Sequence, residues 1–137
     1  MRWSEMITRV RAAIPDIPIT VWCNEDTPLI WGQILREMAG VEATEHLIGE
    51  HALLREIMSR EGFKRFETYL TENPGMTEIQ KRRVITAFLD KFAQEDAIEE
   101  ELDLPGWTEE LIDELSDLYD EDVYTIGRIP GVTLITP

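Results

Sequence analysis

Glu25 and Asp26 are the adjacent carboxylates best placed to do chemistry in this 137-residue chain. They follow a short apolar, β-branched run and precede a stretch with helical spacing, so we expect them between a strand and a helix. Open α/β sheets bind ligands at that edge, where two carboxylates can act as acid and base or hold a metal ion. The pair also fits a polar turn that favours the start of a helix. Because a metal site needs more than one adjacent pair, we favour the turn and keep both residues as ligand candidates.

Arg82 and Arg83, together with Lys81, form the basic cluster of the chain. One or two of these side chains could meet a phosphate, a sulfate or the chain's own acidic segments. Successive residues of a helix point about 100° apart, so the three cannot share one binding face. We therefore favour a solvated helix face with ion pairs, and keep Arg82 and Arg83 as ligand candidates.

The sequence contains no complete catalytic, nucleotide-binding or metal-binding motif. His46 and His51 lie five residues apart, without the second ligand pair that a zinc site needs. Cys23, the single cysteine, lacks the local signature of a nucleophile and fits a small buried hydrophobe. Glycine-rich phosphate loops are missing as well. We expect no cofactor, and the sequence does not indicate an enzyme for this chain alone.

The elements that would position these residues are mainly helical. Apolar spacing and helix-end signals predict five to six helices, with Gly40 suited to a left-handed C-terminal cap. Gly32 lies inside the helix that Gly40 ends, where glycine is unfavourable. Close packing of this helix against the preceding strand would explain it. N-terminal caps are expected at Ser4, Thr27, Thr77 and Thr108.

Two short strands complete the predicted fold. One begins at Ile19 and ends at Cys23, and its apolar, β-branched composition is typical of a strand buried on both faces. The other runs from Val132 to Ile135. The predicted fold class is therefore mainly α with a small α/β element, either as a single domain over residues 1–137 or as the C-terminal portion of a larger α/β domain.

The net charge of −15 is concentrated in the last third of the chain. Residues 1–94 carry 12 basic and 14 acidic side chains, whereas residues 95–137 carry one basic and 14 acidic side chains. Nucleic acids and anionic membranes require a basic face, so we expect neither as a partner. The chain has no long apolar run and no signal-peptide pattern, and its single cysteine favours a reducing compartment, so we expect a cytoplasmic protein.

Two long stretches of the chain are AAIPDIPITVWCNEDTPLIWGQILREMAG and ELIDELSDLYDEDVYTIGRIPGVTLITP. Together they resemble the C-terminal half of bacterial sulfotransferase-like proteins, which have a P-loop-type α/β fold. The resemblance implies a fold whose complete members bind a sulfonate-donating nucleotide. The phosphate-binding loop of that family lies N-terminal to the matching region, and it has no counterpart here, nor have the arginine and serine that hold the 3′-phosphate. Glu25 falls in a matching acidic turn, but no functional residue carries over.

These observations lead to hypotheses from different classes. The first is a non-catalytic C-terminal portion of a sulfotransferase-like protein. The alternative is a small acidic helical module that binds a basic protein through residues 95–122. A third hypothesis, a small hydrolase or metalloenzyme that uses Glu25 and Asp26, depends only on their position. Because unpaired strand edges recruit other chains, we also expect a homodimer or helices that shield the edge.

Overall fold

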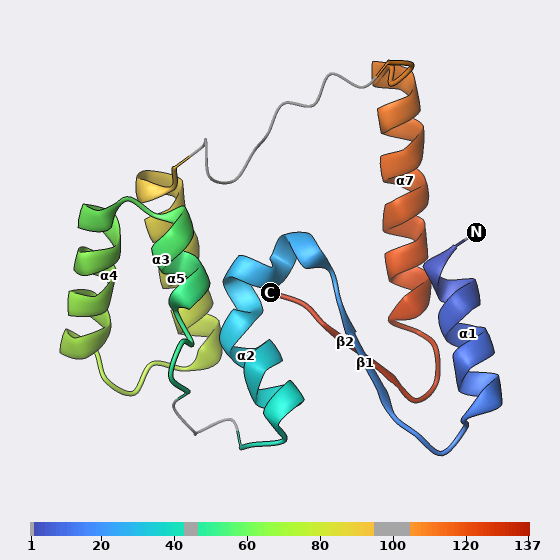
Figure 1. The fold of residues 1–137 in the computed structure, drawn as a ribbon, viewed down its shortest axis with the longest axis horizontal. Coiled ribbons are helices and arrows are strands. Elements are labelled where there is room, and N and C mark those ends of the chain that lie inside the picture. The colour runs from blue at the N-terminus through green and yellow to red at the C-terminus, as the bar shows by residue number, and fades with distance from the viewer. Residues whose placement is uncertain (1, 43–46, 95–104) are drawn as a thin grey trace. The chain divides into compact units, whose positions relative to one another are not determined.

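The computed structural model describes residues 2–42, 47–94 and 105–137, and within these ranges it contains six α-helices and one two-stranded sheet (Figure 1). This confirms the predicted fold class, mainly α with a small α/β element. No helix of the described ranges is long and apolar enough to cross a membrane. The elements are α1 (Trp3–Ala13), β1 (Ile19–Trp22), the 3-10 helix η1 (Asn24–Asp26), α2 (Thr27–Ala39), α3 (Ala52–Ile57), α4 (Arg60–Glu72), α5 (Glu78–Phe92), α7 (Glu109–Ile126) and β2 (Val132–Ile135).

The chain divides into two compact units, each of which is built from separate stretches of sequence. The first unit comes from Met1–Trp22 and Leu102–Ile135, and therefore holds α1, β1, α7 and β2. The second comes from Cys23–Glu101 and Thr136–Pro137, and holds the remaining helices.

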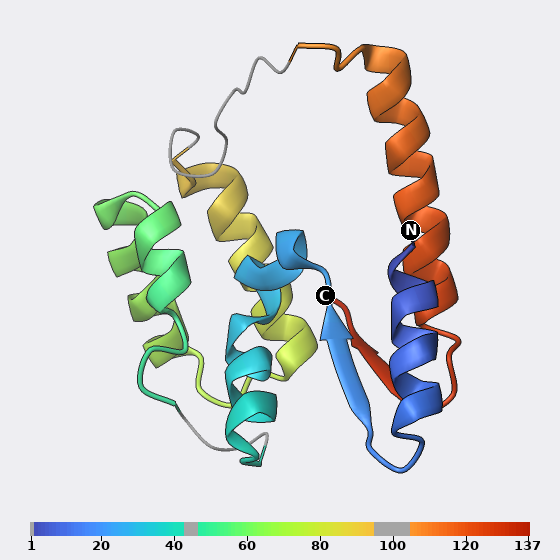
Figure 2. The ribbon, with the colours of Figure 1, turned by 45° about the vertical axis from the view of Figure 1, so that its right-hand side comes forward.

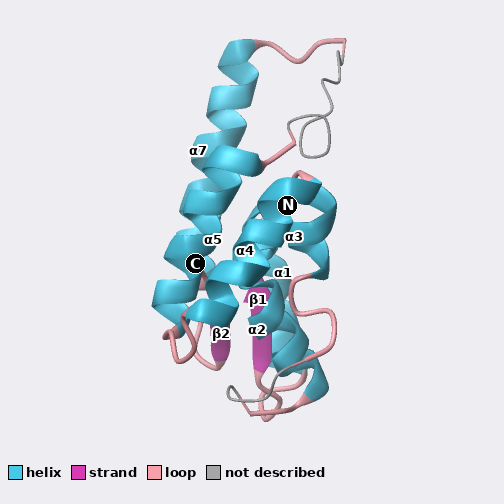
Figure 3. Cartoon of the chain, turned by 90° about the vertical axis from the view of Figure 1, so that its left-hand side faces the viewer, coloured by secondary structure: helices cyan, strands magenta, loops and turns pink. Residues whose placement is uncertain are grey.

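The sheet of the first unit is parallel, with Ile19 opposite Val132 and Trp22 opposite Ile135 (Figure 3). The predicted strand at Val132–Ile135 is confirmed. The first strand ends at Trp22, one residue before the expected Cys23. It is also only half-buried, so the expected burial on both faces is wrong. In the part of the chain that the structure describes, β1 pairs with β2 alone, and one sheet neighbour cannot enclose it.

In the first unit, α1 packs against the C-terminal end of α7, and the side chains of Ile7 and Ile126 are buried. Figures 1 and 2 show that α7 continues well past the N-terminal end of α1. The expected N-terminal cap at Ser4 is wrong, because α1 already begins at Trp3 and Ser4 is buried in its first turn. The cap at Thr108 is confirmed: its side chain accepts a hydrogen bond from the backbone N–H of Leu111 at 3.3 Å.

The second unit has its own hydrophobic core between α3, α4 and α5. Ser59 separates α3 from α4 and caps α4 by accepting from the backbone N–H of Gly62 at 3.1 Å. The predicted cap at Thr77 is confirmed: Thr77 forms a capping box with Gln80 at the start of α5. The buried core residues are Leu54, Ile57, Met58, Phe66 and Ile85.

The start and the interior of α2 differ from expectation, although its end does not. Gly40 has the predicted left-handed conformation, with φ of 65°. Thr27 does not cap the helix: the chain enters through η1, and the Thr27 hydroxyl is buried without a hydrogen-bond partner in the described structure. Gly32 makes room for the side chain of Glu50, not for the strand, because a Cβ there would lie 2.8 Å from Glu50 Cγ.

Candidate functional site

Glu25 and Asp26 lie in η1, directly before α2, as the sequence placed them. Burial raises the pKa of Asp26, and the neighbouring charge of Glu25 raises it further. Within the described ranges, no group of three or more His, Cys, Asp or Glu side chains could hold a metal ion. The pair therefore gains no third ligand from the residues that the structure describes. His46, one of the histidines considered above, lies outside the described residues.

Arg82 and Arg83 are separated by the helix, as their adjacent positions require. Arg82 points from α5 toward α2, where it donates to Gln33 Oε1 at 2.5 Å, and it also donates to the carbonyl of Thr136 at 3.0 Å. Arg83 is exposed. Lys81 pairs with Glu78 of its own helix at 3.1 Å. Arg82 is thus engaged in holding the second unit together, and the basic cluster offers no common face.

A buried arginine, Arg36, organises the polar centre of the second unit. Its guanidinium bonds Glu50 at 2.9 Å and Glu78 at 3.3 Å, while its own side chain is only 5% exposed. Burial alone would raise the pKa of Glu50. The hydrogen bond and charge of Arg36, helped by His51 and Lys81, hold the pKa of Glu50 below its usual value. Glu50 therefore stays ionised at neutral pH, and its contact with Arg36 is part of a structural ion network.

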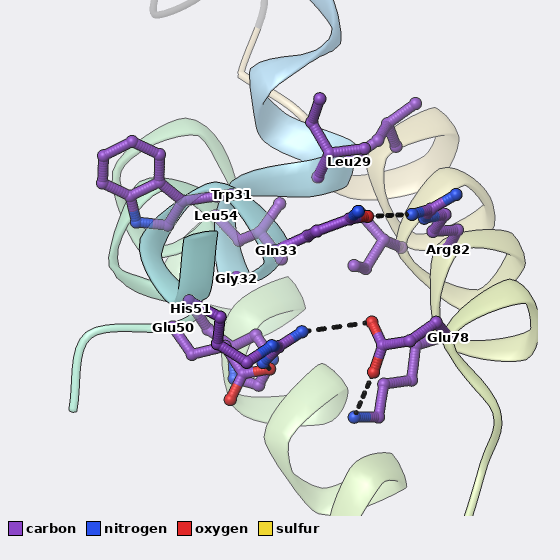
Figure 4. A pocket seen from close by; sticks show the side chains of 13 residues that line it. Leu29, Trp31, Gly32, Gln33, Glu50, His51, Leu54, Glu78 and Arg82 are labelled. Carbon is purple, nitrogen blue, oxygen red and sulfur yellow. Dashed lines mark hydrogen bonds and ion pairs between the residues drawn. The ribbon is translucent and has the colours of Figure 1, made fainter. Parts of the chain in front are cut away.

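The cavity beside this network is too small for a substrate. Its volume is about 30 Å³, which accommodates roughly one or two water molecules. Figure 4 shows Gln33 and Arg82 pointing toward one another, with Glu50 and Glu78 below them in this view. Of the four ligand candidates from the sequence, only Arg82 lines this cavity. The structure thus does not bring those four residues together.

A candidate interaction surface is an exposed apolar row on α7, which we call the α7 stripe. Its members recur at helical spacing on the part of α7 that extends past α1 (Figure 2). These residues are each between 36% and 45% exposed. The α7 stripe consists of Leu111, Ile112, Leu115, Leu118 and Tyr119.

The rest of this segment is acidic. Between residues 109 and 121, α7 carries seven acidic side chains and no basic one. On a helix with 3.6 residues per turn, Glu114 and Glu121 lie along one border of the α7 stripe, and Glu109 and Asp120 lie along the other. Of these seven carboxylates, Glu121 alone has an ion pair in the described structure, with Arg2 at 2.7 Å. The surface therefore combines exposed apolar side chains with carboxylate borders.

Asp122 marks the boundary between the covered and the exposed parts of α7. It is 4% exposed and accepts hydrogen bonds from the backbone N–H groups of Trp3, at 2.7 Å, and of Ser4, as well as from the Ser4 hydroxyl. Burial opposes its ionisation, but these hydrogen bonds outweigh burial and lower the pKa of Asp122. A side chain of α7 thus caps the N-terminus of α1.

Sequence reasoning missed Asp122 and Arg36 as organising residues. Asp122 follows Leu118 by four residues, so an ionisable side chain occupies an otherwise apolar helical row. That irregularity was the available signal. Arg36 carried no such signal, because its partners Glu50 and Glu78 are remote in sequence.

Comparison with protein-family models, with curated proteins and with solved structures finds no match to this chain.

Proposed function

We propose that this chain is a protein-interaction module that binds a basic protein through α7. The observation that carries the proposal is the α7 stripe: a row of exposed apolar side chains, bordered by carboxylates, on the segment of α7 that α1 does not reach. The acidic segment that was predicted to bind a partner was residues 95–122, of which residues 95–104 lie outside the described residues.

Two physical arguments support this function. Contiguous exposed apolar side chains with polar borders are typical of protein-binding surfaces, because their burial in a complex is favourable. The carboxylates then select the partner by charge, since a basic surface is attracted and an acidic surface is repelled. The cavity beside Arg36, in contrast, has no room for a substrate.

Site-specific cross-linking tests the proposal. A photo-reactive phenylalanine derivative placed at Leu115, in the α7 stripe, should capture basic proteins from a cell extract. The same group at Asp117, on the opposite face of α7, is the matched control. Capture from position 115 should fall sharply at about 0.5 M salt, because exposed charges are screened there.

Three results would contradict this function. They are equal capture from positions 115 and 117, capture of acidic proteins, and cross-links from position 115 that reach only the chain's own helices. Circular dichroism should show the same helical content for both labelled chains, so that any difference in capture reflects the surface.

A second candidate function is a non-catalytic C-terminal portion of a sulfotransferase-like protein. The parallel pairing of β1 with β2, with α7 leading directly into β2, favours it, because parallel strands joined through helices are the unit of α/β folds. This candidate predicts no binding of a 3′-phosphoadenosine nucleotide to the chain in calorimetry. Micromolar binding would overturn it.

A further inference from the structure

We infer that the α7 stripe receives a basic amphipathic helix of the partner protein, which lies along α7 in line with α1. This inference rests on the proposed function and adds the shape of the partner to it. The occupant is a helix with apolar residues on one face and Lys or Arg at the borders of that face.

The spacing of residues along α7 would place such a helix against the same row of side chains that α1 packs against. Leu111, Leu115, Leu118 and Asp122 follow one another at spacings of four, three and four residues, so they lie in one row. The last member of this row, Asp122, binds the N-terminus of α1. The row therefore packs against α1 at its Asp122 end and is exposed toward Leu111. A partner helix can cover this exposed part as α1 covers the other.

The contact between Arg2 and Glu121 shows how charge would be matched. Arg2 lies just before α1 and pairs with a carboxylate at the border of the α7 stripe. Two turns earlier on the same border, Glu114 has no ion pair within the described ranges. A partner helix with Lys or Arg beside its apolar row can repeat the Arg2 contact with this carboxylate.

The length of the surface limits the partner segment. Residues 109–121 of a helix span about 20 Å, so three to four turns of a partner helix cover the α7 stripe. A second copy of α7 is a poor occupant, because it would bring seven further carboxylates against the seven already there. Charge complementarity thus selects a basic helix of another protein.

Peptide binding to the full chain tests this inference. The probe is a synthetic peptide of about 18 residues with Leu at heptad positions a and d and Lys or Arg at e and g. We expect it to bind, to gain helicity on binding, and to lose at least about tenfold in affinity when Leu115 becomes Asp, measured by fluorescence anisotropy and circular dichroism. The matched substitution is Ile79→Asp on α5, where Ile79 is 63% exposed, and it should leave affinity unchanged.

A scrambled peptide separates this inference from the proposed function. It has the same composition and charge but no apolar face, so we expect it to bind at least about tenfold more weakly. Equal binding of the two peptides would overturn the inference of a partner helix. The α7 stripe would then remain only as an electrostatic surface for basic proteins. Failure of both peptides, while position 115 still captures basic proteins from extract, would also overturn the helix alone. Failure of the peptides and of the cross-linking together would overturn both.

A charge exchange tests the register. Glu114→Lys in the chain should weaken binding of the basic peptide. A peptide with Glu at its border positions should regain affinity for this variant. No recovery would contradict the contact with Glu114. Dimerisation through the same surface is a separate outcome: a dimer in light scattering that Leu115→Asp dissociates would overturn the inference in favour of a second copy.

Discussion

At the scale of single residues, Asp122 does what the sequence assigned to Ser4. Helix N-termini expose backbone N–H groups that need acceptors, and a serine just before a helix is a common local solution. Here the acceptor comes from α7, more than a hundred residues later, and Ser4 itself becomes a donor to it. One carboxylate thereby fixes both the start of α1 and its position on α7.

Replacing Asp122 with alanine should destabilise the first unit by about 1–3 kcal/mol, because three donors in the first turn of α1 lose their acceptor. Asp120→Ala is the matched control, since Asp120 is an exposed aspartate on the same helix. Thermal unfolding followed by circular dichroism measures both. A loss of the same size in the two variants would show that Asp122 has no special role.

The contribution of Asp122 should also depend on pH. Its pKa is lowered in the folded chain, so the native state binds its proton more weakly than the unfolded state does. The stabilisation is therefore complete above the pKa of an unfolded aspartate, about 3.9, and is lost as the pH falls through the lower folded value. The stability difference between the native sequence and Asp122→Ala should be constant from about pH 5 to 7 and shrink below about pH 4. A difference that grew on acidification would contradict the assigned direction.

At the scale of elements, local signals were read correctly and remote ones were not. Thr77 with Gln80, Thr108 and Gly40 act within four residues of the helix ends that they define, so the sequence predicted them. Thr27 has the right residue type for a cap, but the preceding turn η1 changes the entry of the chain. When tertiary packing decides how a helix begins, the residues near the helix end do not reveal it.

The candidate site follows the same division. The amphipathic pattern of α7 was readable from the sequence, as was its acidity. Its exposure was not, because a helical apolar row normally indicates a buried face. Only the fold shows that α1 begins near Asp122 and leaves Leu118 and Leu115 exposed. Conversely, Glu25 and Asp26 do lie between the strand and the helix, in η1, and no third ligand joins them from the described part of the chain.

The packing of α4 against α5 depends on the absence of a side chain at Gly62. A Cβ at this position would overlap Cβ and Cγ of Phe92, at the end of α5. The backbone of Phe92 cannot retreat, because its carbonyl accepts from the N–H of Ser59 at 2.8 Å. The two helix ends are thus held together at van der Waals distance.

Gly62→Ala should therefore destabilise the second unit, although alanine favours a helix by about 1 kcal/mol. The overlap with Phe92 costs more than this gain, and we expect a net loss of about 1–2 kcal/mol. Gly127→Ala is the control: Gly127 has φ of −61°, and the nearest atom to an added Cβ, on Leu134, is 3.6 Å away. Urea unfolding of the two variants compares them. A Gly62→Ala chain as stable as the native one would show that the helices separate easily.

At the scale of the whole molecule, the first unit is assembled from the two ends of the chain. β1 and β2 are neighbours in the sheet, yet residues 23–101, which form nearly all of the second unit, lie between them in the sequence. The second unit, in contrast, is almost continuous and has its own buried core. The closure of a long connection costs chain entropy, so the first unit depends on a small number of remote contacts, among them those of Asp122.

Two units with separate cores should lose protection separately, and hydrogen exchange of the full chain can decide this. Asp122→Ala should accelerate amide exchange in α1 and in the C-terminal part of α7, while α4 and α5 keep their native rates. Gly62→Ala should do the reverse, because the overlap with Phe92 lies wholly within the second unit. If either substitution accelerated exchange in both units, the chain would unfold as one cooperative domain, as expected from its length alone. Reciprocal patterns would instead show that each unit is stabilised by its own contacts, so that a partner helix bound to α7 would protect α7 and α1 and leave α4 and α5 unchanged.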